Sequence, residues 1–199
     1  LLAGKLAAYC ARAQTMYVED ERRWRVSGDP TEAALVVFGQ KVGFLKADLE
    51  RESPLLAEVP FDYHLKYHAT LHKEEDRNVL TVIGAPEAIL AAADTVRMDG
   101  KDVPLTDALR AEAESAVRAF SQDALRVVAV GVRHTQSANL GEHSIEKLTL
   151  VGFYGMKDAL RPEVKDAVAR AESAGIKVVM ITGDHKLTAA ALAREVGIY

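Results

Sequence analysis

The sequence predicts a mixed α/β chain whose C-terminal part forms a βαβ unit, and therefore a parallel sheet. Residues 147–154 alternate and are rich in Leu, Val and Phe, which is typical of a strand. Residues 164–174 repeat apolar positions at helical spacing, and Gly175 is a helix stop. Residues 176–181 form a short apolar run that suits a buried parallel strand, and a second helix over 186–196 completes the unit.

Two polar side chains, Thr182 and Asp184, lie between that predicted strand and the second helix. Ligands of such folds bind at the carboxyl ends of the strands, and a helix N-terminus favours phosphate. The Thr182 hydroxyl can donate to a phosphate oxygen, whereas Asp184 would orient a lysine or a metal. In the alternative interpretation both side chains merely cap the helix, and local chemistry leaves the two interpretations open.

Two C-terminal segments, GMKDALRPEV and AGIKVVMITGDHKLTAAALAREVGI, resemble the phosphorylation domain of the P-type (E1-E2) ATPases. These proteins are cation pumps that form a phospho-aspartate intermediate. The first segment matches the family's DPPR-like element and the second its TGD element. By this resemblance the catalytic residues are Asp158, Arg161, Thr182, Gly183 and Asp184.

Composition limits the class of protein. The chain has 199 residues, of which 49% are hydrophobic and 27% charged, as in an ordinary soluble globular protein. A net charge of −4 argues against a nucleic-acid partner and a membrane-surface patch. Cys10 is the single cysteine, so no internal disulfide is expected and a reducing compartment fits. No apolar run approaches the roughly 20 residues of a membrane span, we expect no signal peptide, and the start without Met suggests an excised fragment.

The rest of the chain alternates short helices and strands. Gly, Pro and acidic residues mark the helix starts, and charged turns separate the strands. A turn is expected at Asp99-Gly100, and the loop 136–143 should end the first domain. Predicted helices cover 1–13, 31–42, 46–52, 86–93 and 106–122, and predicted strands cover 15–19, 24–27, 66–72, 78–83 and 125–133.

The strand from Lys66 onward alternates apolar and polar residues, which predicts a half-buried strand. Phe61 precedes it near a bend, where an aromatic face could be exposed. In the alternative interpretation Phe61 is a core residue and Lys66 a solvated charge. A metal role is disfavoured for His64, His68 and His72, because residues four apart on one strand lie roughly 13 Å from each other.

Three N-terminal segments resemble the nucleotide-binding domain of the same family: GDPTEAAL, the stretch from Phe61 to Lys66, and GAPE. The resemblance implies that Phe61 stacks on adenine and that Glu32 accepts from its amine. Lys66 and Arg126 would approach the phosphates. Helix-start chemistry alone also explains GDPTE. By the resemblance the nucleotide-binding residues are Thr31, Glu32, Phe61, Lys66, Gly84, Ala85 and Arg126.

The sequence departs from the family pattern at three places. Ile83 stands where the family has a lysine, so an apolar surface remains but a charge is lost, which puts ATP affinity in doubt. Ala159 and Leu160 replace two prolines, and His185 replaces an asparagine. We interpret the latter two as variation within the family.

The resemblance implies an α+β nucleotide-binding domain with an antiparallel sheet over residues 1–146. A partial α/β Rossmann-like (HAD-type) phosphorylation domain follows over 147–199, without the family's DKTGT and GDGxND segments. The expected function is ATP binding for a cation pump at the cytoplasmic face of a membrane. The fragment itself is expected to be soluble and inactive.

The resemblance also implies partners and alternatives. Expected cofactors are ATP and Mg²⁺, with the Mg²⁺ site mostly outside these residues. Expected partners are the transmembrane and actuator domains and the transported cation. The alternatives are a stand-alone soluble nucleotide-binding module and a truncated HAD-type phosphatase.

Overall fold

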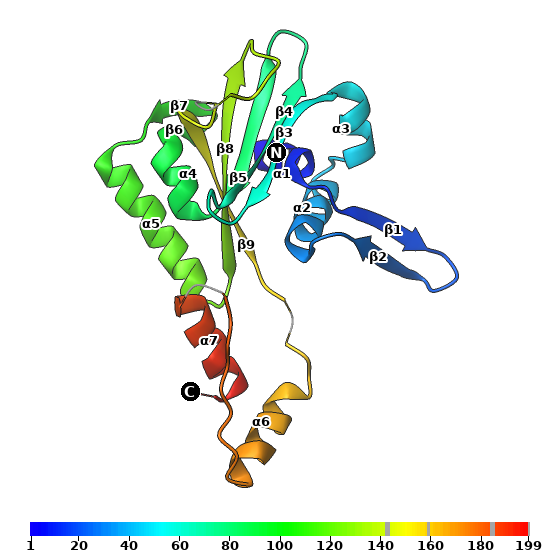
Figure 1. The fold of residues 1–199 in the computed structure, drawn as a ribbon, viewed down its shortest axis with the longest axis vertical. Helices are drawn as coiled ribbons and strands as arrows, with labels where there is room; N and C mark the ends of the chain where they lie inside the picture. Colours follow the sequence, from blue (N-terminus) through cyan, green and yellow to red (C-terminus); the bar gives the residue numbers. More distant parts are fainter. Residues whose placement is uncertain (142–143, 159, 184–185, 199) are drawn as a thin grey trace. The chain divides into compact units, whose positions relative to one another are not determined.

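The computed structural model describes residues 1–141, 144–158, 160–183 and 186–198 (Figure 1). The chain divides into two compact units, each built from two segments. The first unit comprises Leu1–Asp107 and Val128–Tyr154, and the second comprises Ala108–Val127 and Gly155–Tyr199. The domain boundary expected between residues 146 and 147 stays a prediction.

Nearly all predicted elements are confirmed, with small shifts at their ends. The helices are α1 (Leu2–Cys10), α2 (Pro30–Lys41), α3 (Lys46–Glu52), α4 (Pro86–Ala92), α5 (Asp107–Gln122), α6 (Val164–Ser173) and α7 (Lys186–Val196). The strands are β1 (Gln14–Val18), β2 (Arg23–Ser27), β3 (Leu55–Asp62), β4 (Tyr67–Lys73), β5 (Asn78–Gly84), β6 (Ala93–Met98), β7 (Lys101–Pro104), β8 (Arg126–Thr135) and β9 (Leu148–Met156).

The strands form two sheets (Figure 1). β1 and β2 are an antiparallel hairpin, and the other seven follow the order β3-β4-β5-β8-β9-β6-β7. The run β3-β4-β5-β8 is antiparallel, which confirms the antiparallel sheet expected for the first domain. The sheet as a whole is mixed, because β6 pairs with β9 in parallel.

The inner strand β4 is buried on both faces, so the half-buried strand predicted from its alternation is wrong. His68, Thr70 and His72 on its polar face are between 3% and 6% exposed. Helix α1 covers this face: Cys10 Sγ lies 3.4 Å from Thr70 Oγ1, and the Tyr9 ring stacks on the His72 ring with centroids 4.2 Å apart. Polar residues there meet protein rather than water, which the local pattern does not record.

In the second unit, α6 ends as predicted at Gly175, whose φ of +74° is the left-handed conformation that favours glycine. The Ile176 N–H then donates to the Ala171 carbonyl at 2.9 Å. The strand predicted over residues 176–181 is wrong: the run belongs to neither sheet, and Ile181 is 94% exposed. A strand forms only where its backbone pairs with at least one other strand, and no strand of the described chain pairs with this run.

Helix α7 is anchored within the second unit at both of its ends. Near its start the Thr188 hydroxyl donates to the Leu125 carbonyl at 3.2 Å, and near its end Glu195 pairs with Lys157 at 2.8 Å. Among all described residues, no helix combines the length and apolar character needed to cross a bilayer.

Candidate functional site

A hydrogen-bonded turn connects β3 to β4. Asp62 Oδ1 accepts hydrogen bonds from the backbone N–H of His64 at 2.8 Å and of Leu65 at 2.9 Å. The bond from Leu65 and then that from His64 hold the pKa of the Asp62 carboxyl below its usual value. Lys66 closes the turn with a left-handed φ of 59°, and its N–H donates to the Asp62 carbonyl at 2.7 Å. An Asp that bonds its own backbone two residues on is a turn-forming device, so Phe61 and Lys66 are held at the same end of the sheet.

Phe61 is an exposed aromatic residue at the start of this turn. Its side chain is 53% exposed, and its ring packs edge-on against Tyr63 with centroids 5.4 Å apart. The alternative that Phe61 is a core residue is therefore wrong. Because exposed aromatic faces bind flat π-systems, the ring is available for a stacked ligand.

Lys66, Gly84 and Ala85 lie together where β4 starts and β5 ends. The Ala85 N–H donates to the Lys66 carbonyl at 2.9 Å. A Cβ on Gly84 would lie 2.3 Å from that carbonyl oxygen and 2.7 Å from the Tyr67 Cα, so glycine is required by the approach of β4 itself. Lys66 Nζ pairs with Glu87 Oε1 at 3.1 Å, and both side chains are more than half exposed. Such a pair contributes at most about 1 kcal/mol, so an anionic ligand can compete for Lys66.

Thr31 and Glu32 stand in the first turn of α2. Asp29 caps this helix, because its Oδ1 accepts from the N–H of Thr31 at 2.8 Å and of Glu32 at 3.2 Å. Helix-start chemistry is thus present, as the alternative interpretation expects. It does not account for the Glu32 side chain, whose Oε2 accepts from the backbone N–H of Arg12 at 3.0 Å.

Arg12 belongs to a polar network with Glu58 and His68 that the sequence analysis did not predict. Its guanidinium pairs with Glu58 Oε2, and Glu58 Oε1 lies 2.7 Å from His68 Nε2. Burial by itself would raise the pKa of the Glu58 carboxyl, but the bonds to Arg12 and His68 outweigh burial and hold that pKa below its usual value. His68 stands directly opposite Ile83 on β5, and Ile83 is only 6% exposed. The apolar surface expected from Ile83 is therefore mostly inside the protein.

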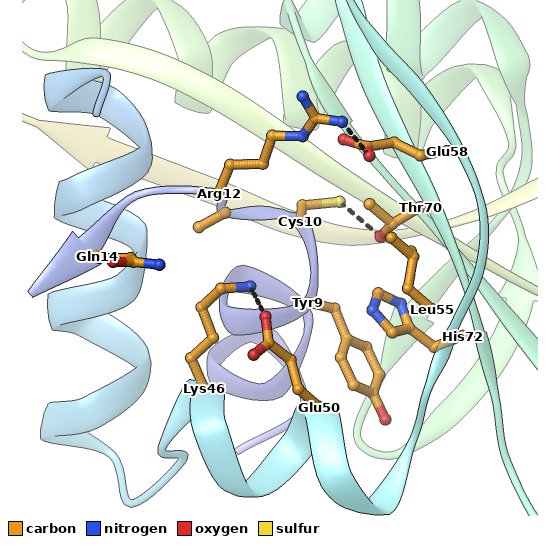
Figure 2. A pocket seen from close by; sticks show the side chains of 11 residues that line it. Tyr9, Cys10, Arg12, Gln14, Lys46, Glu50, Leu55, Glu58, Thr70 and His72 are labelled. Atoms are coloured by element: carbon orange, nitrogen blue, oxygen red, sulfur yellow. Dashed lines mark hydrogen bonds and ion pairs between the residues drawn. The ribbon is translucent and has the colours of Figure 1, made fainter. Parts of the chain in front are cut away.

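A small cavity of about 170 Å³ lies beside Arg12 and Glu58, between α1, α3 and strands β3 and β4 (Figure 2). Arg12 and Glu58 line it together with His72, whose Nδ1 is buried and has no hydrogen-bond partner among the described residues. Burial raises the pKa of the Cys10 thiol in its wall to about 12. None of the predicted nucleotide-binding residues lines this cavity, so it is separate from the site expected from the sequence.

The remaining predicted site residues belong to the second unit. Asp158 and Arg161 are exposed before α6, Thr182 and Gly183 are exposed before α7, and Arg126 is exposed at the start of β8. Their roles stay predictions. Asp184 lies outside the described residues, as do Ala159 and His185. Among the described residues, no group of three or more His, Cys, Asp or Glu side chains could hold a metal ion.

Comparison with known proteins identifies the family. Residues 4–163 match the family model described as P-type ATPase, cytoplasmic domain N. The chain is 40% identical over 174 residues to calcium-transporting ATPase 1 of Lactococcus lactis, covering 86% of this chain and 20% of that protein. It is 36% identical over 204 residues to cation-transporting ATPase pma1 of Synechocystis, covering all of this chain and 21% of that protein.

A third relative is the probable cation-transporting ATPase F of Mycobacterium tuberculosis, 37% identical over 196 residues, which cover 97% of this chain and 21% of that protein. The class defined by these matches is the cation-transporting ATPases. The chain belongs to the P-type ATPase family and contains its cytoplasmic domain N. It spans about a fifth of the length of the curated relatives that it matches.

Proposed function

We propose that this chain is the ATP-binding cytoplasmic portion of a P-type cation-transporting ATPase. The whole pump would couple ATP hydrolysis, through an aspartyl-phosphate, to ion transport across the membrane whose cytoplasmic face this portion occupies. Its partners would be the transmembrane and actuator domains and the transported cation. The family match and the names of the relatives support this proposal.

The observation that carries ATP binding is the exposed Phe61 beside Lys66 at one end of the sheet. The ring offers a stacking surface that is 53% exposed, and the turn fixed by Asp62 holds it in place. Lys66 provides a cation that, in the described part of the chain, pairs with the exposed carboxylate of Glu87. We assign adenine to Phe61 and the phosphates to Lys66, with Gly84 and Ala85 nearby where β5 ends and α4 begins.

The base is the stronger anchor in this proposal. Stacking on an aromatic side chain contributes about 1–3 kcal/mol per base, whereas Lys66 must first leave Glu87. Ile83 is buried and neutral, so it adds no charge to the phosphates. ATP, ADP and AMP should therefore bind with similar affinity.

Residues 147–199 are proposed to belong to a HAD-type phosphorylation domain. The match of Asp158 and Arg161 to the DPPR-like element, and of Thr182 and Gly183 to the TGD element, supports this. Mg²⁺ would neutralise the phosphates during phosphoryl transfer in the whole pump. The proposed role of the chain itself is to bind the nucleotide.

Calorimetry with ATP on the 199-residue chain tests the proposal. Phe61→Ala should weaken binding about tenfold or more, since each 1.4 kcal/mol corresponds to a factor of ten. Lys66→Ala should weaken it less, and Glu87→Gln should strengthen it by releasing Lys66. Phe120→Ala is the matched control, because Phe120 is a partly exposed phenylalanine on α5. Unchanged ATP binding in Phe61→Ala would refute the stacking role.

A further inference from the structure

The polar network from His68 through Glu58 to Arg12 ends at Glu32, a residue of the proposed adenine site. Arg12 is bound at two points: its guanidinium pairs with Glu58, and its backbone N–H donates to Glu32 Oε2 at 3.0 Å. We propose that Arg12 and Glu58 are positioning residues that hold the Glu32 carboxylate for a nucleobase carrying an exocyclic amine. This inference rests on the proposed ATP-binding function.

Only one of the two carboxylate oxygens of Glu32 accepts a hydrogen bond within the described parts of the chain. Its Oε2 is occupied by the Arg12 N–H, and within the described parts of the chain no group donates to its Oε1. A carboxylate is an acceptor only, so the remaining oxygen selects a ligand that donates a hydrogen bond. The 6-amino group of adenine is such a donor. The 6-oxo group of hypoxanthine is an acceptor at the same place, so an inosine nucleotide should be disfavoured.

The anchoring of Arg12 explains why the carboxylate would be in a fixed position. Arg12 lies in the segment between α1 and β1, and its own side chain is 59% exposed. Glu58 and His68 are largely buried, with side chains 13% and 8% exposed, and they lie on neighbouring strands of the large sheet. The sheet therefore fixes Glu58, Glu58 fixes Arg12, and the Arg12 N–H fixes Glu32.

The charges of these residues also support the view that Glu58 holds Arg12 in place. The hydrogen bonds from Arg12 and His68 keep Glu58 ionised despite its burial. A charge-assisted pair between an arginine and a carboxylate is directional as well as strong. Without Glu58, the Arg12 side chain would lose the ion pair that holds it against β3. The Arg12 N–H would then move with the segment between α1 and β1.

The test is the ratio of dissociation constants for ITP and ATP, measured by calorimetry on the whole chain. We expect the unmodified chain to prefer ATP by about tenfold or more, the scale of a hydrogen bond to a charged group. Arg12→Ala and Glu58→Gln should lower this ratio about threefold to tenfold by weakening ATP alone. Arg12→Lys should restore part of it, because a lysine can still reach a carboxylate.

Arg25→Ala is the matched control, since Arg25 also pairs with a glutamate, Glu21, but on the β1–β2 hairpin. An unchanged ratio in Arg12→Ala and Glu58→Gln would overturn the positioning role, as would an equal loss for ATP and ITP. Phe61→Ala separates the two proposals, because stacking serves both bases. If Phe61→Ala weakens both nucleotides but the Arg12 and Glu58 variants leave the ratio intact, the adenine site stands and the positioning role fails. If no adenine nucleotide binds, both proposals fail.

Discussion

Mild acid should destabilise the first unit through His72. This side chain is 3% exposed and stacks on Tyr9, and its Nδ1 has no partner among the described residues. Burial first, and then the charge of Lys46, lowers the pKa of His72 from 6.5 to about 4. A proton on Nδ1 would introduce a buried charge without an acceptor, which is the physical cause of the shift.

The sign and the size follow from these values. Between pH 6.5 and about 4 the unfolded chain binds a proton at His72 that the folded chain does not, so the free energy of unfolding falls as the pH falls through this window. At 1.36 kcal/mol per pH unit the complete loss is about 3 kcal/mol, of which about 2 kcal/mol is reached by pH 5. Well above pH 6.5, from about pH 7.5, the side chain is neutral in both states and the contribution is constant.

Urea unfolding at pH 7, 6 and 5 measures this effect when the unmodified chain is compared with His72→Phe. Phenylalanine keeps a ring against Tyr9 but does not titrate, so the difference in unfolding free energy between the two proteins should change by about 2 kcal/mol from pH 7 to pH 5. His64→Phe, the same change at an exposed histidine of the β3–β4 turn, is the control for the substitution itself. Parallel stability curves for the His72→Phe and unmodified chains would refute the reasoning, as would an NMR titration of the His72 ring with a midpoint above about pH 6.

Three further predictions concern packing. Cys10 is 2% exposed and its thiol pKa is raised to about 12, so a thiol reagent should label it only after urea unfolds the chain; rapid labelling at pH 7 would contradict its burial. Gly84→Ala should lower the unfolding free energy by more than about 1 kcal/mol because of the backbone clash, whereas Gly141→Ala, where a Cβ meets nothing within 4 Å, should be close to neutral in the same melts. Hydrogen exchange should be fast over residues 177–181 and slow over Tyr67–Lys73, since only the latter are paired on both sides; equal protection would mean that 177–181 is paired in solution.

Local chemistry in the sequence was sufficient for most of the elements. The α6 stop at Gly175 and the start of α2 at Pro30 depend on residues within one turn of the helix end, so they can be predicted without knowing the fold. Local chemistry left Phe61 open between an exposed aromatic residue and a core residue, and the structure decides for exposure beside the turn that Asp62 forms. The ordered motifs were sufficient for the family, which the match over residues 4–163 confirms.

Tertiary structure alone decided the rest. Alternation along β4 predicts the strand, but whether its polar face meets water depends on α1. This helix lies some 60 residues earlier, and its Cys10 side chain packs over Thr70. The apolar run 176–181 has the composition of a strand, yet a strand exists only where another pairs with it. Arg12 and Glu58 are 46 residues apart and their pairing leaves no periodic signal, so only the fold could bring them to Glu32.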